Sequence, residues 1–190
     1  LAHHLVAAGD HVDALPTVIW AADHARSVYA FAEARRQLSV AREELWDRVD
    51  DPESLSALSY DELLRLEAEM ARWAGEPSAA TELLRAGLLA VPRTGLPRAR
   101  LELELGEALW AVGDPAGTLA ACERAEAALE PGPRGQVLRV WVLASLAQAL
   151  IATGQYERCQ LVAEQAIALA RTCGATRNAL QARITLATAT

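Results

Sequence analysis

The sequence predicts an all-α protein, an α-solenoid of about ten antiparallel helices. The first observation is a repeated spacing: a small residue is followed four residues later by an apolar one, and three residues after that by alanine. The three sets are Ala79, Leu83 and Ala86; Thr118, Cys122 and Ala125; and Cys159, Ala163 and Ala166. The steps of 39 and 41 residues each accommodate two helices, which is typical of helical repeat proteins.

The second observation is a leucine thirteen residues before each set, with a large apolar residue four positions after it. These pairs are Leu66 and Met70, Leu105 and Leu109, and Leu146 and Leu150. The third observation is that 52% of the residues are hydrophobic, while no long segment alternates with period two as a strand would. A weaker copy of the spacing occurs at Ala34, Leu38 and Ala41. It lies 45 residues before the first set, a longer step than the later ones, which predicts an irregular junction before the regular array.

Turn-forming residues divide the chain into helices, notably at Gly9-Asp10, Gly75–Pro77 and Gly113–Pro115. In chain order we expect helices at Leu1–Ala8, from Val12 to about Arg26, and from near Tyr29 to Val49. A fourth helix opens at Ser59–Glu62 and carries Leu63, Leu66, Met70 and Trp73 at helical spacing. Further helices are expected at Ser78–Val91, Arg98–Val112, after Pro115 to Leu129, at Gln136–Thr153, after the turn Gly154–Tyr156 to about Cys173, and from Ala175 or Thr176 onward.

Two of these helices carry further signals. Ser59 and Glu62 form a capping-box pattern, in which the hydroxyl accepts from a first-turn N–H and the carboxylate reaches back. The segment Gln136–Thr153 is apolar nearly all round. A helix of that kind is covered on several sides, so we expect it to be an inner helix.

We expect two parts along the chain. Residues 1–52 are irregular N-terminal helices that join to an upstream domain, and residues 53–190 are the repeat array, truncated at its C-terminus. The first residue is Leu1 inside a helical pattern, and the last residues contain no helix stop signal. The segment is therefore interpreted as a piece of a longer protein.

Charge and composition exclude several classes of function. The formal net charge is −7 and every one of the 18 basic residues is arginine. Acidic and basic residues are mixed, so we expect no direct nucleic-acid binding. The longest apolar stretch, Val137–Ala152, is interrupted by polar residues and too short to span a bilayer, so we expect no membrane insertion. Three cysteines without a CxxC pair are typical of buried free thiols in a cytoplasmic protein.

No catalytic or metal-binding constellation is recognisable. The four histidines, His3, His4, His11 and His24, form no HxxxH or HExxH pair, and a zinc site needs three or four convergent ligands. Adjacent acids such as Glu43-Glu44 lack a partner histidine, so solvated charges are the better interpretation. We therefore expect no enzyme activity, no metal and no cofactor.

Two segments resemble the tetratricopeptide repeat in the spacing of their small and large residues. They are Leu105-Gly106-x-x-Leu109 with Ala125, and Leu146-Ala147-x-x-Leu150 with Tyr156, Ala163 and Ala166. The periods exceed the usual length of that repeat because the connecting loops at 92–97 and 130–135 are longer. The resemblance implies a degenerate tetratricopeptide-like array.

Longer segments resemble large LuxR-type transcriptional regulators of actinobacteria. These segments are Leu1–Asp10, Ala25–Ala34, Glu44–Val49, Trp110–Gly117 and Val137–Leu150. In that family a STAND ATPase precedes the helical repeats and a helix-turn-helix domain follows them, so the resemblance implies that this chain is the middle region. The chain has no lysine and hence no P-loop, and it has no basic recognition helix, so we expect the segment itself to bind neither ATP nor DNA.

Trp110 and Trp141 fall on the first helices of their repeat units. In tetratricopeptide-like superhelices the first helices line the concave face, and the register places five residues toward it. They are Arg100, Glu107, Trp110, Trp141 and Gln148. Aromatic rings beside a few polar groups suit a peptide or a small ligand. The alternative interpretation is that both tryptophan rings fill the space between layers.

Two functions follow as hypotheses. The first is a non-catalytic regulatory and sensor segment of a transcriptional regulator, with a protein or small-ligand partner and with the ATPase and DNA-binding domains of the parent chain as neighbours. The second is a free-standing adaptor that binds a protein partner in its concave groove. In either case uncovered repeat ends could pair with a second copy to form a homodimer.

Overall fold

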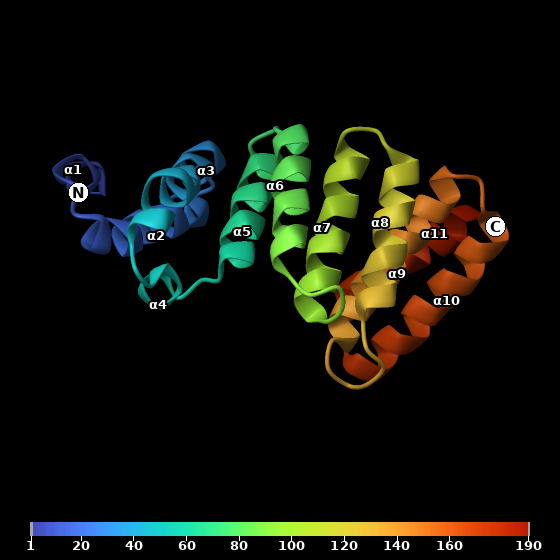
Figure 1. Cartoon of the computed structure of the whole chain (residues 1–190). Coiled ribbons are helices and arrows are strands. Elements are labelled where there is room, and N and C mark those ends of the chain that lie inside the picture. Colours follow the sequence, from blue (N-terminus) through green and yellow to red (C-terminus); the bar gives the residue numbers. More distant parts are fainter. Residues whose placement is uncertain (1, 190) are drawn as a thin grey trace. The chain divides into compact units, whose positions relative to one another are not determined.

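A computed structural model describes the backbone of residues 2–189 and the side chains of residues 3–175 and 180–188. Within that range the chain contains eleven α-helices, one π-helical turn, one 3-10 turn and no β-strand, which confirms the all-α prediction (Figure 1). The elements are α1 (Ala2–Ala8), α2 (His11–Ser27), α3 (Phe31–Val40), η1 (Ala41–Leu45), η2 (Trp46–Arg48), α4 (Pro52–Ser56), α5 (Tyr60–Trp73), α6 (Pro77–Ala90), α7 (Leu96–Ala111), α8 (Pro115–Ala128), α9 (Gln136–Ala152), α10 (Tyr156–Cys173) and α11 (Thr176–Ala189).

Aspartate side chains begin three of these helices. Asp10, Asp51 and Asp114 each accept a hydrogen bond from a first-turn backbone N–H, of α2, α4 and α8 respectively. Each carboxylate thus satisfies a donor that has no partner inside the helix. The hydrogen bond from Ser54 also lowers the pKa of Asp51.

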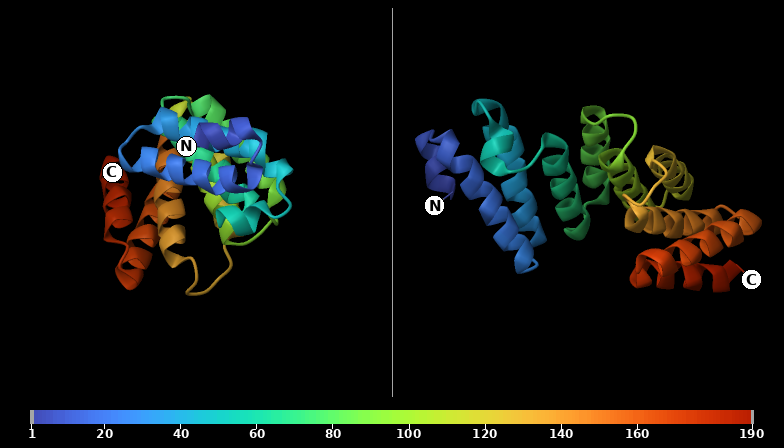
Figure 2. Two further views of the ribbon diagram at one scale, coloured as in Figure 1. Left: turned by 90° about the vertical axis from the view of Figure 1, so that its left-hand side faces the viewer. Right: turned by 90° about the horizontal axis from the view of Figure 1, so that it is seen from below.

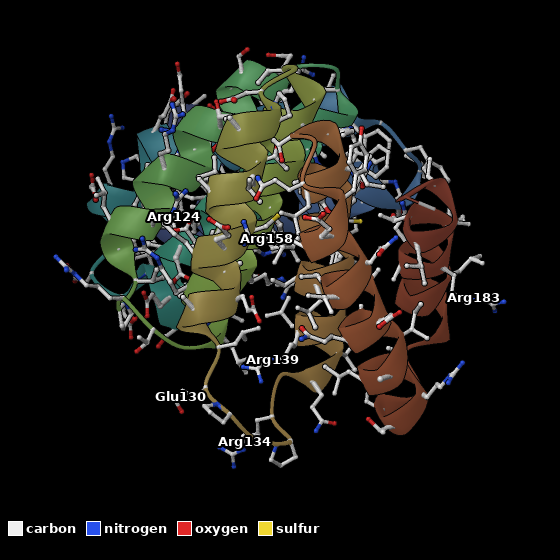
Figure 3. The ribbon with its side chains drawn as sticks, turned by 90° about the vertical axis from the view of Figure 1, so that its right-hand side faces the viewer. Arg124, Glu130, Arg134, Arg139, Arg158 and Arg183 are labelled. Carbon is white, nitrogen blue, oxygen red and sulfur yellow. The ribbon has the colours of Figure 1, made fainter. Side chains whose placement is uncertain are left out.

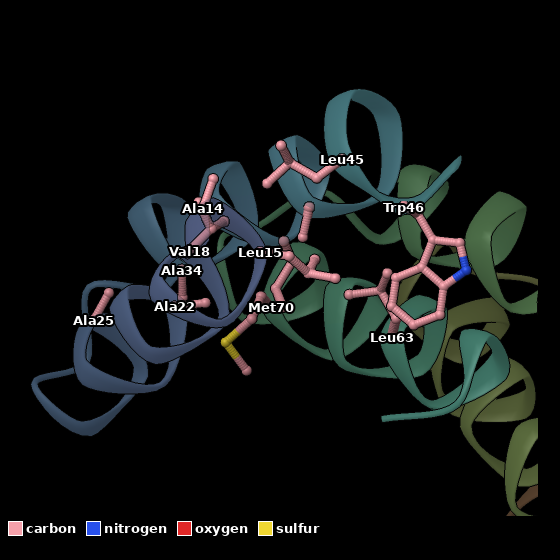
Figure 4. Packing of buried hydrophobic residues seen from close by; sticks show 12 residues of the cluster. Ala14, Leu15, Val18, Ala22, Ala25, Ala34, Leu45, Trp46, Leu63 and Met70 are labelled. Atoms are coloured by element: carbon pink, nitrogen blue, oxygen red, sulfur yellow. The ribbon is translucent and has the colours of Figure 1, made fainter. Parts of the chain in front are cut away.

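The chain forms two compact units, Leu1–Ala90 and Val91–Thr190, called unit 1 and unit 2 below. In unit 1, α2 packs against α3, α3 against α5, and α5 against α6. Its core joins α2, α3, the η1–η2 segment and α5, and includes the buried residues Leu15, Leu45, Trp46 and Leu63 (Figure 4). The division predicted at residue 52 stays a prediction.

Unit 2 consists of two helix pairs, α7–α8 and α9–α10, with α11 packed against α9 and α10 (Figure 2). Helix α9 contacts α7, α8, α10 and α11. Its buried residues include Val140, Val142, Leu146 and Leu150, which project from several sides of the helix. The prediction that this segment is an inner helix is confirmed.

Small residues bring α7 and α8 close together. A Cβ added at Gly106 would lie 3.2 Å from the sulfur of Cys122, so the space beside that glycine is filled. The hydroxyl of Thr118 donates a hydrogen bond to the carbonyl oxygen of Gly106 at 3.1 Å, and thereby ties the two helices directly. The small positions of the repeat therefore act as helix–helix contact points.

The predicted register holds in three helices and is wrong in α6. The three positions of the repeated spacing are all buried in the α3–η1 segment, in α8 and in α10. In α6 the buried residues are Ala80, Thr81, Leu84 and Gly87, while Ala86 is exposed, so the register runs one residue later than predicted. Thirteen residues before Ala80 stands Glu67, which occupies the place of the repeat leucine.

The junction between the third helix and the array is irregular, as predicted, but its form differs from the prediction. The expected helix Tyr29–Val49 is regular only from Phe31 to Val40 and then continues as a π turn and a 3-10 turn. The short helix α4 follows, which the sequence did not indicate. It ends at Ala57, whose backbone is left-handed with φ 56°.

The capping box predicted at the start of α5 is wrong. Ser59 has the extended backbone of an N-cap residue, but its hydroxyl makes no capping hydrogen bond. The carboxylate of Glu62 binds the guanidinium of Arg65 through both oxygens, at 2.8 Å each. Because that side chain is turned along the helix, it does not complete a capping box.

Among the described residues, no helix is both long and apolar enough to cross a membrane.

Candidate functional site

The predicted groove residues of α7 lie on the accessible side of that helix. Arg100 pairs with Glu104 at 3.4 Å, one turn later. Glu107 is half-buried and follows on the same face, and the ring of Trp110 is 42% exposed. Helix α7 therefore presents two charged groups and one aromatic ring along one side.

Trp141 and Gln148 are two turns apart on α9, so they share a face of that helix. Trp141 is 36% exposed and Gln148 is half-buried. Helices α7 and α9 contact one another within unit 2. The five residues thus lie on two adjoining first helices, and both tryptophans keep a third or more of their surface accessible. That they form one groove stays a prediction.

The charges of α7 and α8 are organised around one buried carboxylate. Glu102 is 1% exposed and accepts from Arg98 at 2.8 Å and from Arg124 of α8 at 2.9 Å. Arg158 of α10 pairs with Glu123 of α8 at 2.9 Å. Figure 3 shows Arg124 and Arg158 together with Arg139, whose guanidinium donates to the carbonyl oxygen of Leu129 at 2.8 Å. Arg124, Arg139 and Arg158 therefore join different elements of unit 2, whereas Arg98 pairs within α7.

A pocket of about 390 Å³ lies in unit 1, between α2, α3, the end of α4 and α5. Its apolar lining includes Ile19, Ala22, Leu38, Leu58, Leu66 and Met70. In Figure 4, Met70 of α5 points toward Ala22 of α2, so this floor belongs to the core of unit 1. None of the five predicted groove residues lines the pocket.

Two ion pairs border the pocket. Asp23 and Arg26 of α2 pair at 2.7 Å, and both side chains are largely accessible to solvent. Glu62 and Arg65 of α5 form the second pair, and Arg65 also reaches Glu69 at 3.4 Å. The Arg65 side chain is almost fully buried, so it is fixed, whereas Arg26 can turn.

The pocket exists because the repeat is interrupted. Where the regular array would place one turn between helices, the chain inserts η1, η2 and α4 before α5 begins. Ser56 at the end of α4 donates to the carbonyl oxygen of Pro52 at 2.6 Å and accepts from Leu58 N–H at 3.3 Å, which fixes the pocket wall. The 45-residue step from Ala34 to Ala79 predicted an irregular segment. It did not predict which side chains line the pocket.

An aromatic cluster in unit 1 was also missed by sequence reasoning. The rings of Tyr29 and Phe31 meet edge to face with centroids 6.0 Å apart, and Phe31 stacks with Trp73 at 5.8 Å. The Arg72 guanidinium lies 5.1 Å from the centroid of Trp73. The cluster joins the α2–α3 turn to the end of α5, which the sequence separates by more than forty residues.

Burial affects two of the three cysteines. Desolvation raises the pKa of the Cys122 thiol to about 12, with smaller contributions from Glu107 and Glu123. Desolvation also raises the pKa of Cys159. Both thiols therefore stay protonated at neutral pH, and neither has the lowered pKa of a nucleophile. In the described part of the chain, no group of three or more His, Cys, Asp or Glu side chains is placed to hold a metal.

Known structures share this arrangement of helices. Nearly identical TPR-like repeats from a predicted kinesin light chain of Podospora anserina match with a TM-score of 0.70 and 18% identity, over 94% of this chain and 86% of that one. A structure of MamA protein matches with a TM-score of 0.62 and 15% identity, over 95% and 92% of the two chains. A second MamA structure gives 0.57 and 17%, over 88% and 91%.

No protein-family model matches the sequence, and no curated protein matches it significantly. The structural matches define the fold: the chain has a tetratricopeptide-like helical repeat fold.

Proposed function

We propose that this chain is a non-catalytic regulatory and sensor segment of a LuxR-type transcriptional regulator, which binds a protein partner or a small ligand. The observation that carries the interaction role is the pair Trp110 and Trp141, which stay partly exposed on adjoining helices. Exposed tryptophans flanked by polar groups are typical of binding surfaces. The transcriptional context is supported by the resemblance of the segments at 1–10, 25–34 and 110–117.

In this proposal, binding on the α7–α9 face changes how successive helix pairs pack, and the change reaches the ATPase and DNA-binding domains of the parent chain. The small residues between α7 and α8 suit such coupling. Tightly packed helix pairs move as units rather than deforming continuously.

The parent gene provides the first test. We expect GxxxxGK[ST] after a strand upstream of this segment and a basic helix-turn-helix downstream. If the gene encodes neither, the regulator proposal is wrong, whatever the repeat surface binds.

The surface itself is tested with the two flanking domains, produced separately and titrated calorimetrically into the repeat segment. We expect Trp110→Ala and Trp141→Ala each to weaken binding at least tenfold, as truncation of central aromatic residues commonly does. Trp20→Ala is the matched control, because Trp20 is also exposed but lies on α2. Unchanged affinity in folded Trp110→Ala and Trp141→Ala variants would remove this face from the proposal.

The alternative function is a free-standing adaptor that binds a protein partner in its groove. It is favoured by one observation: the match covers 86% or more of the solved tetratricopeptide-like chains described above, so repeats alone make up most of those chains. An open reading frame that ends near this repeat segment would favour the adaptor over the regulator.

A further inference from the structure

We propose that the pocket of unit 1 is a binding site for a small amphiphilic carboxylate, with its hydrocarbon part on the apolar floor and its carboxylate on Arg26. This inference goes beyond the proposed function. It concerns α2–α5 only, and its test does not depend on whether the α7–α9 face binds a partner.

The size and lining of the pocket define the apolar part of the ligand. A volume of about 390 Å³ lies in the range of pockets that hold small organic molecules. The floor is formed by aliphatic side chains and one thioether, without an aromatic ring. Met70, with its flexible side chain, can adapt to an irregular hydrocarbon shape. A flexible alkyl chain therefore fits this floor.

The bordering charges favour an anion over a cation. Both oxygens of Glu62 already accept from Arg65, so a ligand ammonium group would compete with a two-point interaction. Arg26, in contrast, has donors left for a ligand carboxylate. Its pair with Asp23 uses one N–H of Nη2, whereas a guanidinium carries five N–H donors in a planar fork that matches a carboxylate.

The competing ion pair is weak. Asp23 and Arg26 are three residues apart on one helix, and their side chains are 66% and 47% exposed. Solvent-exposed pairs of this kind contribute little to stability. Arg26 can therefore turn from Asp23 to a ligand carboxylate at small cost, while the fixed Arg65 and the Ser56 hydrogen bonds keep the pocket walls in place.

The chain offers a single-site reporter for this pocket. Met70 is the only methionine in the sequence, and its side chain lines the floor. Protein carrying ¹³C-methyl methionine gives one methyl signal, which reports directly on occupancy of the pocket. We would titrate sodium octanoate, octylamine and octanol, each below its aggregation concentration, into the folded chain.

We expect octanoate to shift the Met70 methyl signal saturably and to bind more tightly than octanol or octylamine. Arg26→Gln should weaken octanoate binding about ten- to hundredfold, the value of one hydrogen bond to a charged group. Asp23→Asn should strengthen it, because it frees Arg26 and removes a negative charge. Arg36→Gln is the matched control, since Arg36 also pairs with a carboxylate three residues away, Glu33, but does not line the pocket.

Opposite effects of Arg26→Gln and Asp23→Asn, with none from Arg36→Gln, would establish the site, because a merely structural role would not change sign. Three results would overturn the proposal: no shift of the Met70 signal with octanoate, octylamine binding as tightly as octanoate, or equal octanoate affinity in wild type and Arg26→Gln. Trp110→Ala should leave octanoate binding unchanged, which separates this test from that of the α7–α9 face.

Discussion

The guanidinium of Arg42 binds the carboxylate of Glu67 at two points, with Nε 2.7 Å from Oε2 and Nη2 3.2 Å from Oε1. Glu67 is 1% exposed, and its hydrogen bond raises the pKa of Arg42 above the usual arginine value. Arg42 lies in the π turn η1 and Glu67 lies in α5, so the pair joins the irregular segment to the first regular repeat helix.

Glu67 occupies the repeat position that leucine fills in unit 2. Leu105 and Leu146 stand thirteen residues before the buried small residues Thr118 and Cys159, and Glu67 stands thirteen before Ala80. The next residues, Ala68, Gly106 and Ala147, are all small and buried, which supports this alignment. Unit 1 therefore has an ion pair at the place where unit 2 has aliphatic packing.

We predict that Glu67→Ala destabilises the chain by about 3 kcal/mol, because it removes the buried carboxylate that is the main partner of Arg42 and leaves this half-buried guanidinium with the exposed Glu43. The double substitution Arg42→Met with Glu67→Leu should lie close to wild type, since apolar residues of similar volume often replace a buried ion pair without loss. Urea unfolding followed by circular dichroism measures both free energies of unfolding.

The single variant Arg42→Met completes a double-mutant cycle for this pair. Arg26→Ala is a suitable control, because its partner Asp23 is exposed and exposed pairs contribute under about 1 kcal/mol. A double variant as unstable as Glu67→Ala would contradict the view that Glu67 occupies a leucine position.

The same pair explains where sequence reasoning failed. The predicted α6 register rests on Ala79, Leu83 and Ala86, with Leu66 thirteen residues before them. The residue at the repeat position is Glu67, so this register lies one residue early. In α7 and α9 the repeat position does hold leucine, at Leu105 and Leu146, and the register predicted for the following helices α8 and α10 is confirmed. The periodic hydrophobic pattern predicted the fold because apolar residues recur at the positions that the fold buries. It failed at Glu67, because this charged side chain is buried through a partner, Arg42, 25 residues away in the sequence.

The pocket could not be predicted for a related reason. Its lining comes from four elements, of which α4 has only five residues and no buried residue to create a periodic signal. Which residues share a face of α7 or α9 was easier to predict, because residues two turns apart on a helix lie on the same side. Trp141 and Gln148 illustrate this, although helical periodicity alone does not define a ligand.

We predict that Leu146→Ala destabilises the chain by about 2–5 kcal/mol, because Leu146 is fully packed in the core cluster that joins α8, α9 and α10. The matched control is Leu161→Ala on α10, where the leucine side chain is 61% exposed. That substitution should change the free energy of unfolding by under about 0.5 kcal/mol. Similar urea midpoints for the two variants would contradict the assigned repeat register.

Alkaline pH tests the buried thiol of Cys122. Its pKa is about 12 in the folded chain, whereas an exposed cysteine has a pKa of about 8.5. Below about pH 8.5 the thiol is protonated in both states, so its contribution to stability is constant. As the pH rises from about 9 to 12 the unfolded chain loses this proton first, and the free energy of unfolding falls by up to about 1.4 kcal/mol per pH unit.

Cys122→Ala should therefore reduce the slope of unfolding free energy against pH above about pH 9, whatever its effect on stability at neutral pH. Cys159 adds a second contribution of the same sign, because burial raises its pKa as well, so the slope should diminish further in the double variant with Cys159→Ala. The chain has no lysine, so no ammonium side chain titrates in this range. Urea unfolding at a series of pH values under reducing conditions gives the slopes. Equal slopes in wild type and in both variants would mean that the two thiols are not shielded from water.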